Sequence, residues 1–293
     1  MWKLLQIELF KIFKRPRTYI PFAAIAAIIL IIQLGLKFDG QSYLEMGMSS
    51  VSDTFSIPYS LIMNGYLVAF VILNTLLIQI PLLVALVAGD MVAGEANMGT
   101  LRLLVTRPVS RTQLMLVKFG ASVIYTILLL IWMALLALFL SMWLFGTNDL
   151  VIARDTVIEH IRKTDVLWRY IAAFGYAMVA LSTVAALAFL LSVFAENSIG
   201  PIVATISIVV VLTILSEMRI PIYDNTVKPW LFTSHMLAWK GFFYSQSDGQ
   251  GGTIPGSIEN LPSVLKSLGI LLAYIAAFVT AAIWAFRKKD ILS

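Results

Sequence analysis

The chain has 293 residues, of which 60% are hydrophobic and only 13% are charged, and its mean hydropathy is +0.90. A soluble protein could not bury that much apolar surface, so these values indicate an integral membrane protein in contact with lipid. The formal net charge of +5 is spread over short polar stretches, which favours membrane lipid as a partner and gives no reason to expect nucleic acid. Cysteine is absent, which excludes disulfides and thiolate metal sites.

Residues 1–15 predict an amphipathic helix in the membrane interface. A signal peptide would also start with a basic region, but the apolar run that follows is long for one. We expect the helix to lie with its apolar side toward lipid and to lead into the first span. The apolar side consists of Trp2, Leu5, Leu9, Ile12 and Phe13, and Lys3, Lys11 and Lys14 lie mostly opposite.

Six apolar segments follow, each near or above the ~20 residues that a helix needs to cross a bilayer. The fourth and fifth are separated by three polar residues, which predicts a tight helical hairpin. The expected fold class is an all-α integral membrane protein with a single transmembrane domain over 1–293. The expected spans are 18–36, 57–89, 114–145, 170–194, 199–215 and 264–286.

Lysine and arginine gather at the N-terminus, between the second and third spans, and in the C-terminal tail. The positive-inside rule places these regions, and so both termini, in the cytoplasm, with the chain in the cytoplasmic membrane. The connection 216–263 is then a long extracytoplasmic loop. Within it, 229–244 predicts either an interfacial or re-entrant helix or a plain aromatic belt, and in both cases aromatic side chains sit at the headgroups. These are Trp230, Trp239, Phe242 and Phe243.

The sequence contains no G-x-x-x-x-G-K-[ST], no H-E-x-x-H and no G-x-S-x-G. We therefore expect no enzyme activity, catalytic residue, cofactor or metal site in this chain. No acidic residue, arginine or histidine lies deep in an expected span, which disfavours an ion-coupled secondary transporter, and Lys118 and Lys266 lie near span ends, where lysine can snorkel. Neutral polar side chains in the spans either bond helix to helix or line a translocation path. They are Gln33, Asn64, Asn74 and Gln79.

The segment 94–113, between the second and third spans, is compact and basic. Thr100 can cap a short helix over 101–105. Pro108 ends that helix, because a residue before proline is biased away from the α region. Ser110 then begins an S-x-x-Q capping box that starts the third span. The segment therefore predicts a short cytoplasmic helix lying crosswise between two long ones.

The side chains of this segment suit a cytoplasmic protein partner. Arginines would pair with acidic groups of the partner, while leucines would fill its groove. For the arginines, the alternative is retention on the cytoplasmic side with contacts to lipid headgroups. Glu95 pairs with one of the arginines, caps the turn, or is an ordinary solvated carboxylate. The arginines are Arg102, Arg107 and Arg111, and the leucines are Leu101, Leu103 and Leu104.

The same segment resembles the permease subunits of type-2 ABC exporters, where G-E-x-x-x-G-T-L-x-x-L-L-x-x-P-[VI]-S-R lies between the second and third spans. Here Val105 replaces the second of the paired leucines. The N-terminal helix, the six spans and the long last outer loop fit the same pattern, so the resemblance covers essentially the whole chain. The matching residues are Glu95, Gly99, Thr100, Leu101, Arg102, Arg107, Pro108, Val109, Ser110 and Arg111.

The resemblance implies that two such chains, identical or paralogous, form the translocation path and that each docks a cytoplasmic ABC ATPase subunit, which holds ATP and Mg. The implied function is the membrane subunit of an ATP-driven exporter. A non-transporting scaffold that recruits a cytoplasmic partner and a secondary transporter are the alternatives, and an extracytoplasmic partner at the outer loops stays open. The implied docking residues are Glu95, Gly99, Thr100, Leu101, Arg102, Leu103, Leu104, Arg107, Pro108, Ser110 and Arg111.

Overall fold

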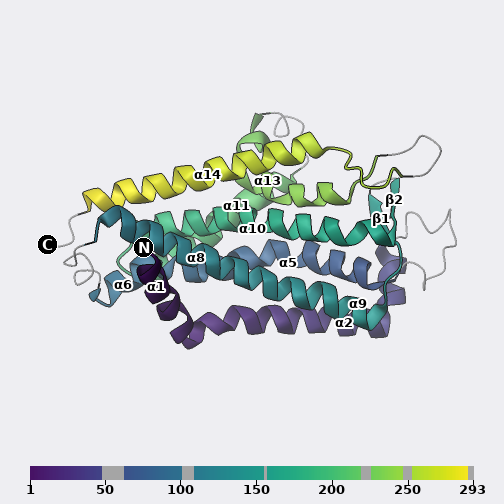
Figure 1. Ribbon diagram of the computed structural model, residues 1–293, viewed down its shortest axis with the longest axis horizontal. Helices are drawn as coiled ribbons and strands as arrows, with labels where there is room; N and C mark the ends of the chain where they lie inside the picture. The colour runs from purple at the N-terminus through teal and green to yellow at the C-terminus, as the bar shows by residue number, and fades with distance from the viewer. Residues whose placement is uncertain (48–62, 101–108, 155–156, 219–225, 247–252, 290–293) are drawn as a thin grey trace.

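The computed structural model describes residues 1–47, 63–100, 109–154, 157–218, 226–246 and 253–289. Within these residues, six helical segments are long and apolar enough to cross a membrane, and they run side by side in an elongated bundle (Figure 1). The chain is therefore a helical, multi-pass membrane protein, as the sequence predicts. The segments are Pro16–Gly40, Gly65–Asn97, Arg111–Phe145, Lys163–Phe194, Ile199–Glu217 and Leu261–Lys288.

Several of these segments consist of more than one helix. In the first half of the chain the elements are α1 (Trp2–Lys14), η1 (Pro16–Tyr19), α2 (Ile20–Gly47), α5 (Gly65–Ala88), α6 (Asp90–Asn97), α8 (Arg111–Ala134), the π-helical turn η2 (Leu135–Leu140) and α9 (Ser141–Phe145). The elements that follow are β1 (Leu150–Arg154), β2 (Val157–Ile161), α10 (Lys163–Phe194), α11 (Ile199–Glu217), η3 (Lys228–Trp230), α13 (Phe232–Met236), η4 (Leu237–Phe243) and α14 (Leu261–Lys288).

Helix α10 forms the centre of the bundle and packs against α5, α8, α11 and α14. Its apolar window is 72% buried, whereas those of α2, α11 and α14 are 28%, 22% and 17% buried. Small side chains on α10 let neighbouring backbones approach closely, which is how helices pack in a membrane. The buried alanines of this helix include Ala173, Ala177, Ala180, Ala185 and Ala188.

A short β-hairpin departs from the all-α expectation. Strands β1 and β2 pair antiparallel, with Val151 opposite His160, in the connection between the third and fourth spans. Both strands are rich in valine and isoleucine, which favour strands, but each has only five residues. Alternation over so short a length is a weak sequence signal for a strand.

The long connection before α14 folds back onto the bundle. Its described part runs through η3, whose second residue is Pro229, and then through α13 and η4. Trp239 and Phe243 are fully buried, with ring centroids 5.7 and 5.3 Å from that of Phe70 in α5. The prediction that these two rings lie at the lipid headgroups was therefore wrong. The loop is long enough for them to pack against the protein's own aromatic side chains. Trp230 does remain exposed.

One end of the bundle holds α1, α6 and the end of α14, and the hairpin lies at the other end (Figure 1). We call the first of these the basic end. An even number of spans places both termini on the same side of a membrane. Which side that is stays a prediction of the positive-inside rule. Among the described residues, the cations at the basic end include Lys3, Lys11, Lys14, Arg15, Arg17, Arg111, Lys118, Arg287, Lys288 and Lys289.

Candidate functional site: an ionic cleft at the basic end

A proline-directed break lets α1 fold back across the end of the bundle. Arg15, with φ −87° and ψ 123°, is extended, as expected for a residue before proline, and Pro16 opens η1. The hydroxyl of Thr18 donates to the carbonyl of Ile12 at 2.6 Å, and the Tyr125 hydroxyl of α8 donates to the Thr18 carbonyl at 3.1 Å. The break is therefore held from both sides, and α1 rests against α8.

The apolar side of α1 meets protein, not lipid as predicted. Ile12 belongs to the buried core of the bundle, and Leu5 and Leu9 are partly buried against it. The exposed large apolar side chains of α1 are Trp2, Ile7 and Phe10. The amphipathic pattern is real, but α8 also offers an apolar surface, and the pattern itself does not distinguish a protein surface from a lipid one.

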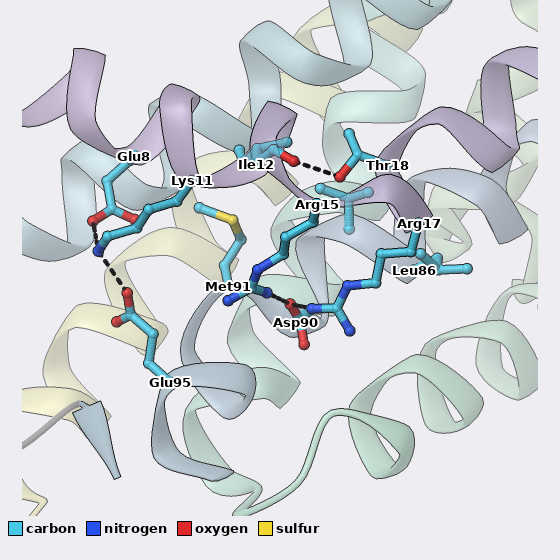
Figure 2. Close-up of a pocket in the computed structure, with 11 residues that line it drawn as sticks. Glu8, Lys11, Ile12, Arg15, Arg17, Thr18, Leu86, Asp90, Met91 and Glu95 are labelled. Carbon is cyan, nitrogen blue, oxygen red and sulfur yellow. Dashed lines mark hydrogen bonds and ion pairs between the residues drawn. The ribbon is translucent and has the colours of Figure 1, made fainter. Parts of the chain in front are cut away.

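Four charged side chains from three helices form a closed ring of ion pairs, part of which is drawn in Figure 2. Lys11 Nζ of α1 lies 2.7 Å from Glu8 Oε1 and 2.9 Å from Glu95 Oε1 of α6. Lys118 Nζ of α8 lies 2.9 Å from Glu8 Oε2 and 2.6 Å from Glu95 Oε2, the latter as an ion pair without the alignment of a hydrogen bond. Two carboxylates and two ammonium groups thus alternate and sum to zero charge.

The ring explains how charged side chains are tolerated inside the protein. The side chain of Lys118 is only 1% exposed, and an unpaired charge buried that deeply costs several kcal/mol. Burial alone would raise the pKa of Glu8, but Lys118 and Lys11 outweigh it and hold this pKa below its usual value. Burial alone would lower the pKa of Lys11, but Glu8 and Glu95 raise it above its usual value. Both groups are therefore charged at neutral pH.

A second cluster surrounds Asp90, the first residue of α6. Arg15 and Arg17 both donate to Asp90 Oδ2 and reach it from two sides, as Figure 2 shows. The hydroxyl of Ser198, in the connection between α10 and α11, donates to Asp90 Oδ1. One buried carboxylate therefore joins the start of the first span, the end of the second and the turn between the fourth and fifth.

Helix α6 has sequence features that fit this position. Ser192 Oγ of α10 accepts from the backbone N–H groups of Val92 and Ala93, at 2.9 and 3.0 Å, and so satisfies donors that the first turn leaves free. A Cβ on Gly94 would lie 2.4 Å from Asp90 Oδ1, so only glycine leaves room for this carboxylate. Gly99, at φ +67°, follows the C-cap in the left-handed conformation that commonly ends helices.

Between the two clusters lies a small cleft that is partly open to solvent (Figure 2). Its polar lining comes from both clusters and its apolar wall from α5. Across the described part of the chain, no three His, Asp or Glu side chains gather as metal ligands would. Six of its lining residues carry charged side chains, which suit the cleft to ionic contacts. Its lining is Glu8, Lys11, Ile12, Arg15, Arg17, Thr18, Leu86, Val87, Asp90, Met91 and Glu95.

The predicted docking residues divide into three groups. Glu95 is buried in the ring and pairs with lysines, while the exposed Thr100 donates to the Glu95 carbonyl at 3.3 Å. Ser110 caps α8 as predicted, accepting from Gln113 N at 3.2 Å, and Arg111 Nη1 donates to carbonyls at the end of α14, 3.0 Å from that of Arg287. Outside the described residues lie Leu101, Arg102, Leu103, Leu104, Arg107 and Pro108.

Two of the polar residues predicted for a translocation path have hydrogen-bond partners in the structure. Gln33 is fully buried, and its amide nitrogen donates to Leu136 O and Ser141 Oγ at 3.0 and 2.9 Å. Asn64 caps α5, accepting from two backbone N–H groups of its first turn at 3.0 Å. Asn74 is half-buried on α5, and Gln79 is exposed on the same helix. Gln33 therefore bonds one helical segment to another, whereas Asn64 caps its own helix.

Sequence reasoning missed most of the two clusters. Lys118 was taken for a snorkelling lysine, and Asp90 lay just beyond an expected span. The available signal was a charge on an otherwise apolar helix face. Glu8 shares the spacing of Leu5 and Ile12, and Lys118 continues the buried face of α8. Such a residue indicates a buried partner of opposite charge.

Comparison with known proteins corrects the assignment made from the 94–111 motif. Over 116 residues the chain is 29% identical to the uncharacterized protein YhcI of Bacillus subtilis (strain 168), an alignment that spans 39% of this chain and only 37% of that relative. Residues 22–292 match a family described as "Protein of unknown function (DUF2705)". The match is not to a type-2 ABC permease family, so that identification was wrong. The chain belongs to the DUF2705 family.

Proposed function

We propose that the chain is the membrane-spanning subunit of a transport complex whose energy comes from a separate cytoplasmic ATPase. The observation that carries this proposal is that ion pairs connect several helices at the basic end. There, Glu95 and Asp90 of α6 are bound to cations of α1, η1 and α8. A force applied to the connection after α6 would reach several spans as one rigid body.

The connection between α6 and α8 is attached to the second span before it and to the third span after it. Helix α6 follows α5 directly at Gly89, and Ser110 starts α8. Arg111 binds the last carbonyls of α14, and Lys289 Nζ donates to Val193 O at the end of α10, at 2.8 Å. Movement of the segment would therefore also reach the fourth and sixth spans.

A small pocket beside a proline of the second span supports a moving bundle over a purely scaffolding role. It lies among α5, α10, α11, α13 and η4. Pro81 in its wall lies inside α5, where proline removes a backbone hydrogen bond and favours bending. In this proposal the basic end faces the cytoplasm, the partner binds ATP and Mg, and a second copy or paralogue completes the path.

The test is co-purification from membranes with cytoplasmic proteins, followed by measurement of ATP hydrolysis. We expect an ATPase to purify with the wild-type chain and to be lost or uncoupled in an Arg102→Glu/Arg107→Glu variant, whose two positions lie outside the described residues. The matched control is Arg287→Glu/Lys288→Glu, which makes the same charge change on exposed residues at the same end.

The outcomes separate the alternatives. Association of an ATPase that survives the control but not the test variant supports the proposal. A cytoplasmic partner without ATPase activity would instead support a scaffold. Equal binding by both variants and the wild type would show that the arginines only set topology.

A further inference from the structure

The Asp90 cluster has unequal numbers of positive and negative groups. Arg15 and Arg17 share this one carboxylate, so the trio carries a net charge of +1. The neighbouring ring of two carboxylates and two lysines is neutral and does not offset that charge. The two clusters together, with four cations and three carboxylates, therefore carry one positive charge in excess, where the first span begins.

Both guanidinium groups retain the capacity to bind an anion. The contacts to Asp90 engage one nitrogen of each group and a single oxygen, Oδ2. A guanidinium has five N–H donors in a fork that matches the oxygens of a phosphate. The side chains of Arg15 and Arg17 are 31% and 45% exposed, so a ligand can reach them from the cleft.

The surroundings of the arginines fit a ligand that also has hydrocarbon chains. Arg17 belongs to η1, and the next residues toward the membrane, Tyr19 and Ile20, are exposed large side chains. Leu86 and Val87 form the apolar wall of the cleft. Helix α2, which continues from η1, is largely unburied by protein over its apolar window. A phosphate at the arginines would thus have acyl chains beside a lipid-facing helix.

We propose that Arg15 and Arg17, at the mouth of this cleft, bind the phosphate of an anionic lipid headgroup. The lipid supplies the negative charge that the trio lacks, and its chains lie along the exposed start of α2. The site holds the lipid at the junction of α1, α2 and α6. It is independent of the partner proposed above, and its test needs neither an ATPase nor a transported substrate.

The test measures lipid retention by the purified full-length chain in detergent, using native mass spectrometry with added phosphatidylglycerol or phosphatidylcholine. The wild type should retain phosphatidylglycerol more tightly. Arg17→Gln should weaken that retention roughly fivefold, because one basic side chain near a lipid surface contributes about that factor. Lys3→Gln is the matched control, since it removes one exposed positive charge from α1 and should leave retention unchanged.

Asp90→Asn should change lipid retention in the direction opposite to Arg17→Gln. It raises the net charge of the trio to +2 with almost no change in shape, so phosphatidylglycerol should bind more tightly. If the cluster had only a structural role, Asp90→Asn would weaken the retention of phosphatidylglycerol, just as Arg17→Gln does. If Asp90→Asn does not fold, Arg17→Lys keeps the charge and should retain more phosphatidylglycerol than Arg17→Gln.

Three results would overturn the proposal. The first is equal retention of the two lipids by the wild type. The second is an equal loss in Lys3→Gln and Arg17→Gln, which would mean diffuse attraction to the surface. The third concerns the thermal unfolding temperature of the lipid-free protein. If millimolar inorganic phosphate raises it as much as phosphatidylglycerol does, the ligand is a free phosphate.

Discussion

The ammonium group of Lys118 lies 2.9 Å from the carboxylate of Glu8, 110 residues earlier in the chain. The pair connects the N-terminal helix to the interior of the third span. The ammonium group of Lys118 also forms an ion pair with Glu95 of α6. Helix α1 is therefore part of the bundle, although its sequence resembles that of a free interfacial helix.

Replacing Lys118 by methionine should destabilise the protein strongly. The change leaves Glu8 and Glu95 with only Lys11 between them, and removing one partner of a buried ion pair costs about 3–5 kcal/mol. The apparent unfolding temperature in detergent should fall clearly below that of the exposed control Lys14→Met. The Glu8→Gln/Lys118→Met double variant should lose less than the sum of its single variants, because the two residues interact. Additive losses would contradict the ring.

Attachment of α1 should depend on pH at both extremes. Glu8 has a lowered pKa in the folded protein, so its stabilising contribution is complete above its usual 4.5 and disappears as the pH falls through the lower folded value. Lys11 has a raised pKa, so its contribution is complete below 10.5 and disappears as the pH rises through the higher folded value.

Detachment of α1 can be measured by the distance between spin labels at Gln6→Cys and Asn97→Cys, two exposed positions, since the chain has no cysteine of its own. We expect a constant distance between the two pH limits and a longer distance beyond them. Glu8→Gln should abolish the acid transition specifically. An acid transition that persists unchanged in this variant would have to come from another carboxylate.

Gly94→Ala should disrupt the Asp90 cluster. The new Cβ would lie 2.4 Å from Asp90 Oδ1 and would push the carboxylate away from Arg15, Arg17 and Ser198. Overpacking of this kind typically costs about 1–3 kcal/mol. The control is Gly175→Ala on α10, where nothing lies within 4 Å of the new Cβ, and it should be neutral or slightly stabilising. Equal unfolding temperatures for the two variants would argue against the close approach at Gly94.

Arg169→Met should release the connection between α11 and α14 from α10. The buried guanidinium lies 2.7 Å from Asp165 Oδ2 and donates to Phe242 O and Ser257 O at 2.6 and 2.7 Å. Its loss leaves one carboxylate and two carbonyls without these partners, at a cost of about 3–5 kcal/mol. Hydrogen exchange should accelerate in 237–246 and 253–260. In the exposed control Arg162→Met it should stay at the wild-type rate.

The motif that suggested an ABC permease has local structural explanations. Gly99 ends α6 in a left-handed conformation, and Ser110 caps the next helix. Any connection that stops one span and starts another needs such residues. Ser110 predicted the start of α8 correctly, but residues of this kind are not specific enough to define a family.

The sequence by itself determined the six apolar helices, the helix over 2–14 and the cap at Ser110, because these depend on the hydrophobicity and spacing of residues near one another in the chain. Only the tertiary structure decided which face of α1 meets protein and which cations meet Glu8, Glu95 and Asp90. Lipid and protein interior are both apolar, so periodicity cannot tell which will cover a helix face. The ionic partners are far apart in sequence, and only the packing of α1, α6 and α8 brings them within reach.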